Sequence, residues 1–179
     1  ARDDSGRTAL MRASWHGYLN VVKLLIKNNA SLDAKCADGD TPIEFAVKNG
    51  HGDIVKLLIE KRANLEGSTL LLSMCSGCAH ATTSVEMVKL LIAHGARVND
   101  RFKDGTTVLH WVSKGSNTDL LKLLIENGAC LDAEDEHGRT PLFYATMQGK
   151  CDTVKLLTQH MQAKFPPKCD DEGRTPLDY

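Results

Sequence analysis

One short segment of the chain carries residues at a spacing that metal and redox sites use. Cys75 and Cys78 are separated by two residues, and His80 follows closely. A structural zinc site needs four ligands, usually completed by a second pair at comparable spacing, and no second pair lies nearby. Nothing around the segment indicates the βαβ context of a thioredoxin-like redox motif. We therefore expect small residues in a long loop, with a metal or redox site as the alternative, and no metal or cofactor in the protein.

The other cysteines are scattered along the chain, where most of them stand in for other small residues. They are Cys36, Cys130, Cys151 and Cys169. A chain of this size with a regular apolar core has no need of covalent cross-links. We expect all six thiols to be reduced, as in an intracellular protein.

Residue types that catalyse reactions are present but are not combined into a catalytic pattern. Five histidines, at positions 16, 51, 94, 137 and 160, fall at predicted turns or helix ends, and no Ser or Cys nucleophile accompanies them at a telling spacing. The acidic run from Asp132 to Glu136 is interpreted as a solvated loop. The sequence contains no phosphate-binding loop, and it predicts a protein that is not an enzyme.

Composition excludes two further classes of function. The 179 residues carry a net charge of −1 with acidic and basic side chains intermixed, which argues against a nucleic-acid-binding surface. No apolar run approaches the roughly 20 residues that a membrane-spanning helix requires, and the N-terminus does not resemble a secretion signal. We expect a cytoplasmic protein, with the nucleus as an open alternative.

A short cassette that combines a turn with a helix start is repeated along the chain. It reads Asp135-Glu136-His137-Gly138-Arg139-Thr140-Pro141-Leu142 in its fullest form, and it recurs around Gly6, Gly39 and Gly173. Glycine permits a positive-φ turn, Thr caps a helix N-terminus, and Pro suits the first helical position because its missing N–H would have no partner there. Each copy of the cassette therefore predicts the start of a helix.

Two ladders of residues show the period of the repeat. Positions 30, 63, 96 and 129 are all Ala, and positions 23, 56, 89, 122 and 155 are all Lys within apolar runs such as Val22-Lys23-Leu24-Leu25. Both ladders have the same even spacing, thirty-three positions from one member to the next. The period predicts a stack of helix pairs in which neighbouring units bury a continuous apolar strip.

With these motifs the chain resembles the ankyrin-repeat family. The family's T-P-L-H-x-A box stands here as Thr41-Pro42-Ile43-Glu44-Phe45-Ala46, Thr107-Val108-Leu109-His110-Trp111-Val112 and Thr140-Pro141-Leu142-Phe143-Tyr144-Ala145. The resemblance implies an all-α solenoid of stacked helix-turn-helix units with projecting β-turn loops. It also implies that His110, at the box His, makes structural hydrogen bonds within or between turns.

The whole chain, residues 1–179, is expected to form a single array, and to be a monomeric segment of a longer protein. We place the repeats at about 4–35, 38–66, 67–100, 104–133 and 136–165, with a partial sixth at 171–179. Repeat three is irregular: the preferred alignment puts Thr69 at a helix start, with a long loop between Met74 and Glu86. The alternative keeps strict spacing and places Ala79 at the Ala46 position, at the cost of the Thr-x-Leu box.

The resemblance also indicates which side chains face a partner. In this family, the x position of the box and the positions just after its Ala face the concave groove. The x position holds Arg12, Phe45, Ser73, Trp111 and Tyr144, and the nearby positions hold Trp15, Lys48, Lys114, Met147 and Gln148. Only 5% of the residues are aromatic, yet four aromatic residues occupy these groove-facing positions. Because aromatic and basic anchors dominate protein interfaces, we expect a groove that binds protein or peptide. The alternative is that these rings pack against neighbouring first helices.

One asparagine is a candidate for modification. Asn99 resembles the loop asparagine that intracellular asparaginyl hydroxylases modify in ankyrin repeats, while the matching positions hold Asp33, Glu66 and Asp132. A plain turn asparagine is the alternative.

These observations predict non-catalytic protein–protein recognition on the concave groove, chiefly through Trp111, Tyr144 and Phe45. The rival interpretation is a regulatory or scaffolding segment of a larger enzyme, channel or effector that packs against its own chain. Binding residues vary freely on an unchanged repeat frame, so the repeat pattern defines the fold and not the identity of the partner.

Overall fold

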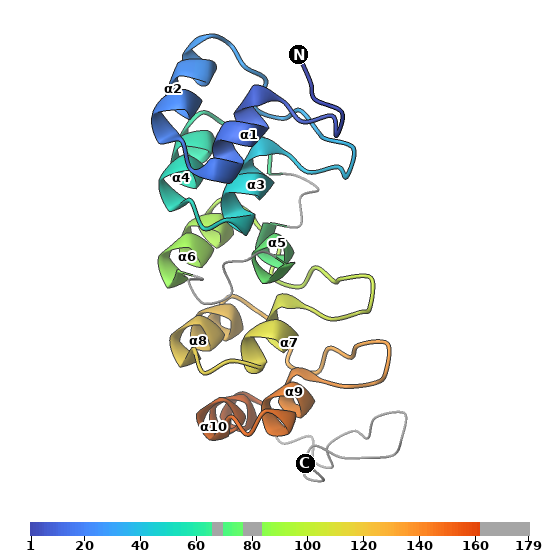
Figure 1. The fold of residues 1–179 in the computed structure, drawn as a ribbon. Helices are drawn as coiled ribbons and strands as arrows, with labels where there is room; N and C mark the ends of the chain where they lie inside the picture. Colours follow the sequence, from blue (N-terminus) through green and yellow to red (C-terminus); the bar gives the residue numbers. More distant parts are fainter. Residues whose placement is uncertain (66–69, 77–83, 162–179) are drawn as a thin grey trace. The chain divides into compact units, whose positions relative to one another are not determined.

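The computed structural model describes residues 1–65, 70–76 and 84–161, and these residues form ten α-helices. The chain divides into two compact units, Ala1–Ala96 (unit 1) and Arg97–Tyr179 (unit 2). Unit 1 contains α1 Ala9–His16, α2 Leu19–Lys27, α3 Pro42–Lys48, α4 Gly52–Glu60, α5 Leu70–Ser76 and α6 Val85–Ala93. Unit 2 contains α7 Val108–Ser113, α8 Thr118–Glu126, α9 Pro141–Met147 and α10 Cys151–His160 (Figure 1).

Helices pair within a repeat and stack between repeats. In unit 1 the first helices α1, α3 and α5 pack in a row, and the second helix α2 packs against α4 (Figure 1). In unit 2, α7 packs against α9 and α8 against α10. The longest described helix, α10, has 10 residues, and none of the described helices is long and apolar enough to cross a membrane. The all-α repeat architecture expected from the sequence is confirmed.

The predicted threonine caps begin the first helices. Thr8, Thr41, Thr107 and Thr140 each precede a first helix with an extended backbone. The Thr8 hydroxyl accepts a hydrogen bond from the Met11 N–H at 3.3 Å. Pro42 and Pro141 occupy the first helical positions, where a backbone N–H has no intrahelical partner. The Thr and Pro positions of the cassette therefore coincide with helix starts, and the inferred hydroxyl cap is present at Thr8 but not at Thr140.

Tight turns precede these helices, and neighbouring turns are hydrogen-bonded. The Asp135 N–H donates to the Arg139 carbonyl at 3.0 Å to close one turn, and the Glu136 N–H donates to Asp104 of the preceding turn at 2.9 Å. Gly105 has φ +77°, and a Cβ on it would approach the Asp135 backbone to 3.2 Å. Glycine is needed there both for its left-handed backbone and for the closeness of the next turn.

Repeat three follows the preferred alignment. Helix α5 begins at Leu70, directly after Thr69, and α6 begins at Val85. A strictly even spacing would place the first helix of this repeat later in the chain, and Ala79, on which the alternative alignment depends, lies outside the described residues. The long loop expected between Met74 and Glu86 falls mostly on residues 77–83, which lie outside the described residues.

The core follows a leucine ladder on the second helices. Leu58, Leu91, Leu124 and Leu157 stand one repeat period apart, and each is 0% exposed. Burying one such side chain contributes about 1.5–3 kcal/mol relative to leaving it in water. The buried core residues therefore recur with the same period as the sequence repeat.

Candidate protein-binding surfaces on the first helices

The predicted partner-binding residues occupy two positions of the repeating unit. We call the first the inner position and the second the outer position, and within each the members are separated by whole repeat periods. The inner position holds Arg12, Phe45, Trp111 and Tyr144. The outer position holds Trp15, Lys48, Lys114 and Met147. All lie on first helices except Lys114, which is the C-cap residue of α7, and four of them belong to each unit.

In unit 1 the aromatic side chains pack on each other beneath a cation. The ring centroids of Trp15 and Phe45 are 5.4 Å apart, and the Arg7 guanidinium lies 5.0 Å and 5.4 Å from them. Trp15 is 39% exposed, whereas Phe45 is 2% exposed and packs with Met11 and Cys36. The accessible aromatic surface of this Trp15–Phe45 cluster therefore belongs to Trp15, which Arg7 and Phe45 hold in place.

The remaining unit 1 candidates are basic residues with acidic partners. Arg12 pairs with Asp3 at 2.7 Å, and Lys48 pairs with Asp40 at 2.6 Å. The Arg7 backbone N–H is the largest influence on the pKa of Asp3, and together with Arg12 it outweighs desolvation and keeps that pKa below its usual value. Both carboxylates precede the first helix that carries their basic partner, so each ion pair sets the direction of the basic side chain.

In unit 2 a lysine covers two rings. The Lys114 ammonium lies 4.1 Å from the Trp111 ring centroid and 4.7 Å from that of Tyr144. The Trp111 indole N–H donates to the Thr106 hydroxyl at 3.2 Å, and the Phe102 ring lies 5.8 Å away. Trp111 is half-buried by these contacts. At the end of the same surface, Met147 is 41% exposed.

A buried carboxylate supports this unit 2 cluster. Asp135 accepts hydrogen bonds from the Tyr144 hydroxyl at 2.6 Å and from Arg139 Nε at 2.9 Å. Burial raises the pKa of Asp135, but its hydrogen bonds to Tyr144, His137 and Arg139 outweigh this and leave the pKa lowered. Burial and the bond to Asp135 raise the pKa of Tyr144. The network holds an ionised Asp135 under a neutral Tyr144, which fixes the tyrosine ring.

Phe45 and Tyr144 differ from the expected picture of rings open to a groove. Phe45 is 2% exposed and Tyr144 8%, so both pack in the manner of the alternative set out above. Cations lie over both rings, and each ring also contacts the neighbouring first helix, Phe45 through Trp15 and Tyr144 through His110. A direct contact of either ring with a partner stays a prediction. Arg12, Trp15 and Met147 are exposed, while Lys48, Trp111 and Lys114 are partly so.

Arg7 and Arg139 belong to these clusters although the sequence did not single them out. Each follows the turn glycine of the cassette, in Gly6-Arg7-Thr8 and Gly138-Arg139-Thr140. Their guanidinium groups lie over Trp15 and Tyr144 respectively, the latter at 5.3 Å. The recurrence of Arg at this place in three cassettes, the third being Gly173-Arg174-Thr175, was the available signal.

His110 makes the structural hydrogen bonds that the box His predicts. Its Nδ1 accepts from the Thr107 N–H at 3.0 Å, and its Nε2–H donates to the Arg139 carbonyl of the next repeat at 3.1 Å. The residue is 0% exposed. Burial lowers the pKa of His110, and the bond to Arg139 offsets this only in part. His110 therefore has the predicted structural role, and its lowered pKa favours the neutral ring.

Asn99 bridges two neighbouring turns. Its amide donates to the Gly128 carbonyl at 2.8 Å and accepts from the Cys130 N–H at 2.8 Å. Asp33, at a matching position, accepts from the Asn64 N–H at 2.7 Å. Asn99 thus has the structural role of a turn asparagine, and its hydroxylation stays a prediction.

The candidate metal and redox segment lies only partly within the described residues. Cys78 and His80 lie outside them, as does Cys169, and for Cys75 only the helical backbone is described. Among the described side chains, no group of three or more His, Cys, Asp or Glu is arranged to hold a metal ion. Cys36, Cys130 and Cys151 are free thiols.

The stacked helix pairs and hydrogen-bonded turns define a helical repeat protein. A family model described as "Ankyrin repeats (3 copies)" matches residues 1–69 and 72–169. The chain belongs to the ankyrin-repeat family, and this membership supports a protein-interaction module.

A solved structure agrees with this assignment. The structure is titled "Bd0816 Predatory Endopeptidase from Bdellovibrio bacteriovorus in complex with immunity protein Bd3460", and the matched chain is 30% identical with a TM-score of 0.75. The match covers 89% of the present chain and 83% of the other. No curated protein matches the sequence.

Proposed function

We propose that this protein binds a partner protein without catalysis, using the exposed members of the inner and outer positions on the concave, first-helix side of the repeats. The observation that carries the proposal is the exposure of large side chains at one repeating position. Trp15 is 39% exposed in unit 1, and Met147 is 41% exposed in unit 2. Basic residues held by rings or ion pairs share these surfaces.

The clusters are suited to recognition because their side chains are already ordered. Arg7 and Phe45 hold the Trp15 ring, and Lys114 lies across Trp111 and Tyr144. Side chains ordered before binding lose less conformational entropy when a partner covers them. Tryptophan and basic side chains are also enriched among the residues that dominate binding energy.

The structural comparison supports protein binding in general terms. The matched chain comes from a complex of an endopeptidase with an immunity protein, so a fold of this kind, at 30% identity, occurs in a protein–protein complex. From this comparison we infer only the class of ligand, a folded protein, and not which protein it is.

Alanine substitutions at exposed positions test the proposal. We expect Trp15→Ala and Met147→Ala to weaken binding of a partner isolated with the whole chain, with tenfold or greater loss at the tryptophan. Leu24→Ala is the matched control and should leave binding unchanged, because Leu24 is also exposed, at 60%, but lies on the second helix α2. Affinity is measured by calorimetry, and folding is checked by thermal unfolding. Normal binding by both folded variants would exclude this surface.

Trp111 and Lys114 separate anchoring from packing in unit 2. Truncating a buried anchor typically costs about 2 kcal/mol or more in binding, whereas an exposed charge contributes about 0–1 kcal/mol. We therefore expect Trp111→Ala to reduce affinity far more than Lys114→Ala. If Trp111→Ala instead lowers stability and leaves binding to the residual folded protein unchanged, the indole is a core side chain.

A further inference from the structure

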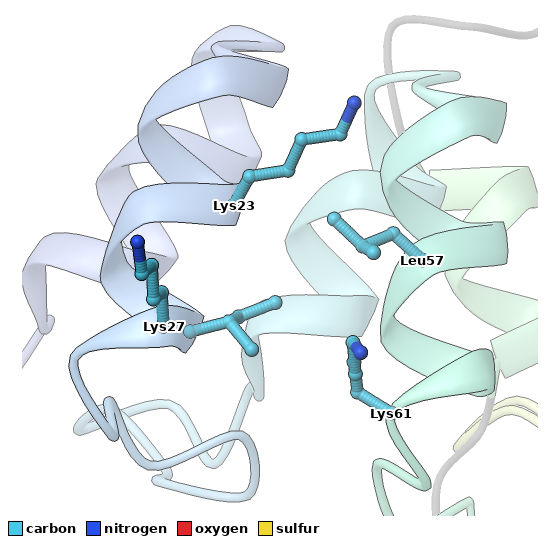
Figure 2. A pocket seen from close by; sticks show the side chains of 5 residues that line it. Lys23, Lys27, Leu57 and Lys61 are labelled. Carbon is cyan, nitrogen blue, oxygen red and sulfur yellow. The ribbon is translucent and has the colours of Figure 1, made fainter.

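A groove lies between the second helices α2 and α4 of unit 1, away from the first helices. It is lined by Lys23, Ile26 and Lys27 of α2, by Leu57 of α4, and by Lys61, the C-cap residue of α4. Its volume is about 550 Å³. Figure 2 shows Lys23 reaching from α2 toward α4 and Leu57 pointing back toward α2. We call it the α2–α4 groove.

The groove combines an apolar floor with a cationic rim. Ile26 and Leu57 are partly buried and form the floor, while Lys23, Lys27 and Lys61 are exposed. Within the described part of the chain, none of these three ammonium groups forms an ion pair or hydrogen bond, and no carboxylate lines the groove. Three positive charges thus surround an apolar strip in a protein whose net charge is −1.

The repeat supplies an internal comparison. The floor residues recur one repeat on as Ile59 and Leu90, and again in unit 2 as Ile125 and Leu156. The lysine ladder also recurs, so Lys23 has counterparts throughout.

The other two rim positions do not recur. Position 27 becomes Glu60 and Glu126, and position 61 becomes His94 and His160. The floor is therefore required by the fold, whereas the excess of positive charge is confined to the α2–α4 groove. A repeat frame that tolerates Glu and His at these positions has no structural need for two lysines.

We propose that the α2–α4 groove binds an acidic segment of a partner protein, one that places an aliphatic or aromatic side chain between carboxylates. The apolar side chain would lie on Ile26 and Leu57, and the carboxylates would pair with Lys23, Lys27 and Lys61. Desolvating an apolar floor alongside complementary charges gives both affinity and selection of the acidic partner.

The surroundings favour a short peptide segment over extended polyanions. Asp53 and Glu60 are exposed on α4, so acidic residues are interspersed with the basic ones on this helix. Duplex nucleic acid and anionic bilayers are bound through larger basic surfaces that contact many phosphates or headgroups. A small inorganic anion would leave the apolar floor unused.

The groove is independent of the function proposed above. Its residues lie on α2 and α4, whereas that function uses α1, α3, α7 and α9. Substitutions at Trp15 and Met147 are therefore expected to leave the groove unaffected, and the two proposals can fail separately.

Binding of a defined probe tests the proposal. The probe is a fluorescein-labelled, N-acetylated peptide of sequence Glu-Asp-Leu-Asp-Glu, titrated with the whole chain by fluorescence anisotropy. We expect saturable binding that weakens as ionic strength rises from about 0.05 M to about 0.3 M, because exposed charge pairs are screened. The double variant Lys27→Glu/Lys61→His should bind about tenfold more weakly, since it loses two cations and gains a carboxylate.

These substitutions are chosen to preserve the fold. The variant carries residues that two other repeats have at each of these positions, Glu at 60 and 126 and His at 94 and 160, so its thermal unfolding should match that of the parent chain. The opposite change, Glu126→Lys/His160→Lys, creates the same rim between α8 and α10 and should add a second peptide-binding site. Gain of a site in unit 2 and loss in unit 1 together would establish that the rim lysines select the ligand.

Three outcomes would overturn the proposal. The first is equal binding of the neutral peptide Gln-Asn-Leu-Asn-Gln. The second is undiminished binding by the folded Lys27→Glu/Lys61→His variant. The third is binding of vesicles of phosphatidylserine and phosphatidylcholine, or of a DNA duplex, without binding of the acidic peptide.

Discussion

At the scale of single residues, the same structural role is met by different side chains. Glu44 stands where the repeat box of this family has His, and it accepts from the Thr41 N–H at 2.7 Å and from the Thr41 hydroxyl at 3.0 Å. His110 accepts from the corresponding groups of Thr107 at 3.0 Å and 2.9 Å. His110 also donates to the Arg139 carbonyl, a bond that an ionised carboxylate cannot make.

His110 should make stability depend on pH near neutrality. Burial lowers its pKa in the folded protein from the ordinary 6.5. Below pH 6.5 the unfolded chain therefore takes up a proton that the folded chain does not, and the free energy of unfolding falls as pH falls. The slope is at most about 1.4 kcal/mol per pH unit for one proton. Urea unfolding at intervals from about pH 7.5 to about pH 5 measures it.

The variant His110→Asn is the control for this prediction. An Asn oxygen can still accept from the Thr107 N–H, but the side chain does not titrate. The variant should lose some stability at pH 7.5 and show a shallower decline toward pH 5. Asp135 and Asp104, whose pKa values are lowered from 3.8, titrate below this window. Identical slopes for the two proteins would show that His110 is not the group responsible.

Sequence reasoning succeeds at this scale where the chemistry is local. A Thr cap, a turn glycine and a box His each act within a few residues, so Thr107, Gly105 and His110 were predictable. Arg7 and Arg139 were missed because a long side chain has many rotamers. The ring over which it settles is set by packing between repeats, and this packing also buries Phe45 and Tyr144.

At the scale of elements, one position shows what stacking does to a helix. Val21 in α2 is 45% exposed, while Ile54 and Met87, at the same position of α4 and α6, are 1% and 7% exposed. Ile54 belongs to α4, against which α2 packs. The pattern of apolar residues is nearly the same in all three helices, so the sequence indicates an apolar face but not which copies are covered.

This difference predicts opposite responses to the same substitution. Val21→Gln should change the free energy of unfolding by no more than about 0.5 kcal/mol, as is usual at exposed sites. Ile54→Gln should cost several kcal/mol, because it removes buried apolar volume and leaves an amide without assured partners. Urea unfolding followed by circular dichroism compares the two variants. Equal losses would mean that the Val21 face is covered in solution, and equal tolerance would mean that Ile54 is not a core residue.

Repeat three shows which elements could be predicted from the sequence. The Thr-x-Leu box placed its first helix correctly, since α5 begins at Leu70 although Thr69 follows Thr41 by less than a full repeat period. A helix start is predicted from capping chemistry and an apolar pattern, both of which survive a change in loop length. Residues between the two helices of this repeat carry no such signal, so only the length of their loop could be predicted.

At the scale of the whole molecule, the chain repeats one period but divides into two compact units, Ala1–Ala96 and Arg97–Tyr179. The leucine ladder runs through both, with Leu58 and Leu124 at the same position and each 0% exposed. The expectation of a single array across 1–179 stays a prediction. In repeat arrays, stability is a sum of local terms and nearest-neighbour interface terms, so the number of unfolding transitions reports whether the repeats are coupled.

Matched core substitutions in the two units test the single array. Leu58→Ala and Leu124→Ala should each cost about 2–5 kcal/mol locally, because each removes the same buried side chain. If the chain is one cooperative array, either variant lowers one common urea midpoint with an unchanged slope, and the fluorescence of Trp15 and of Trp111 reports the same transition. These indoles lie in units 1 and 2 respectively, so single-tryptophan versions, Trp15→Phe and Trp111→Phe, follow each unit separately. A midpoint that shifts only in the substituted unit would show that the units unfold independently, and the single-array prediction would then be wrong.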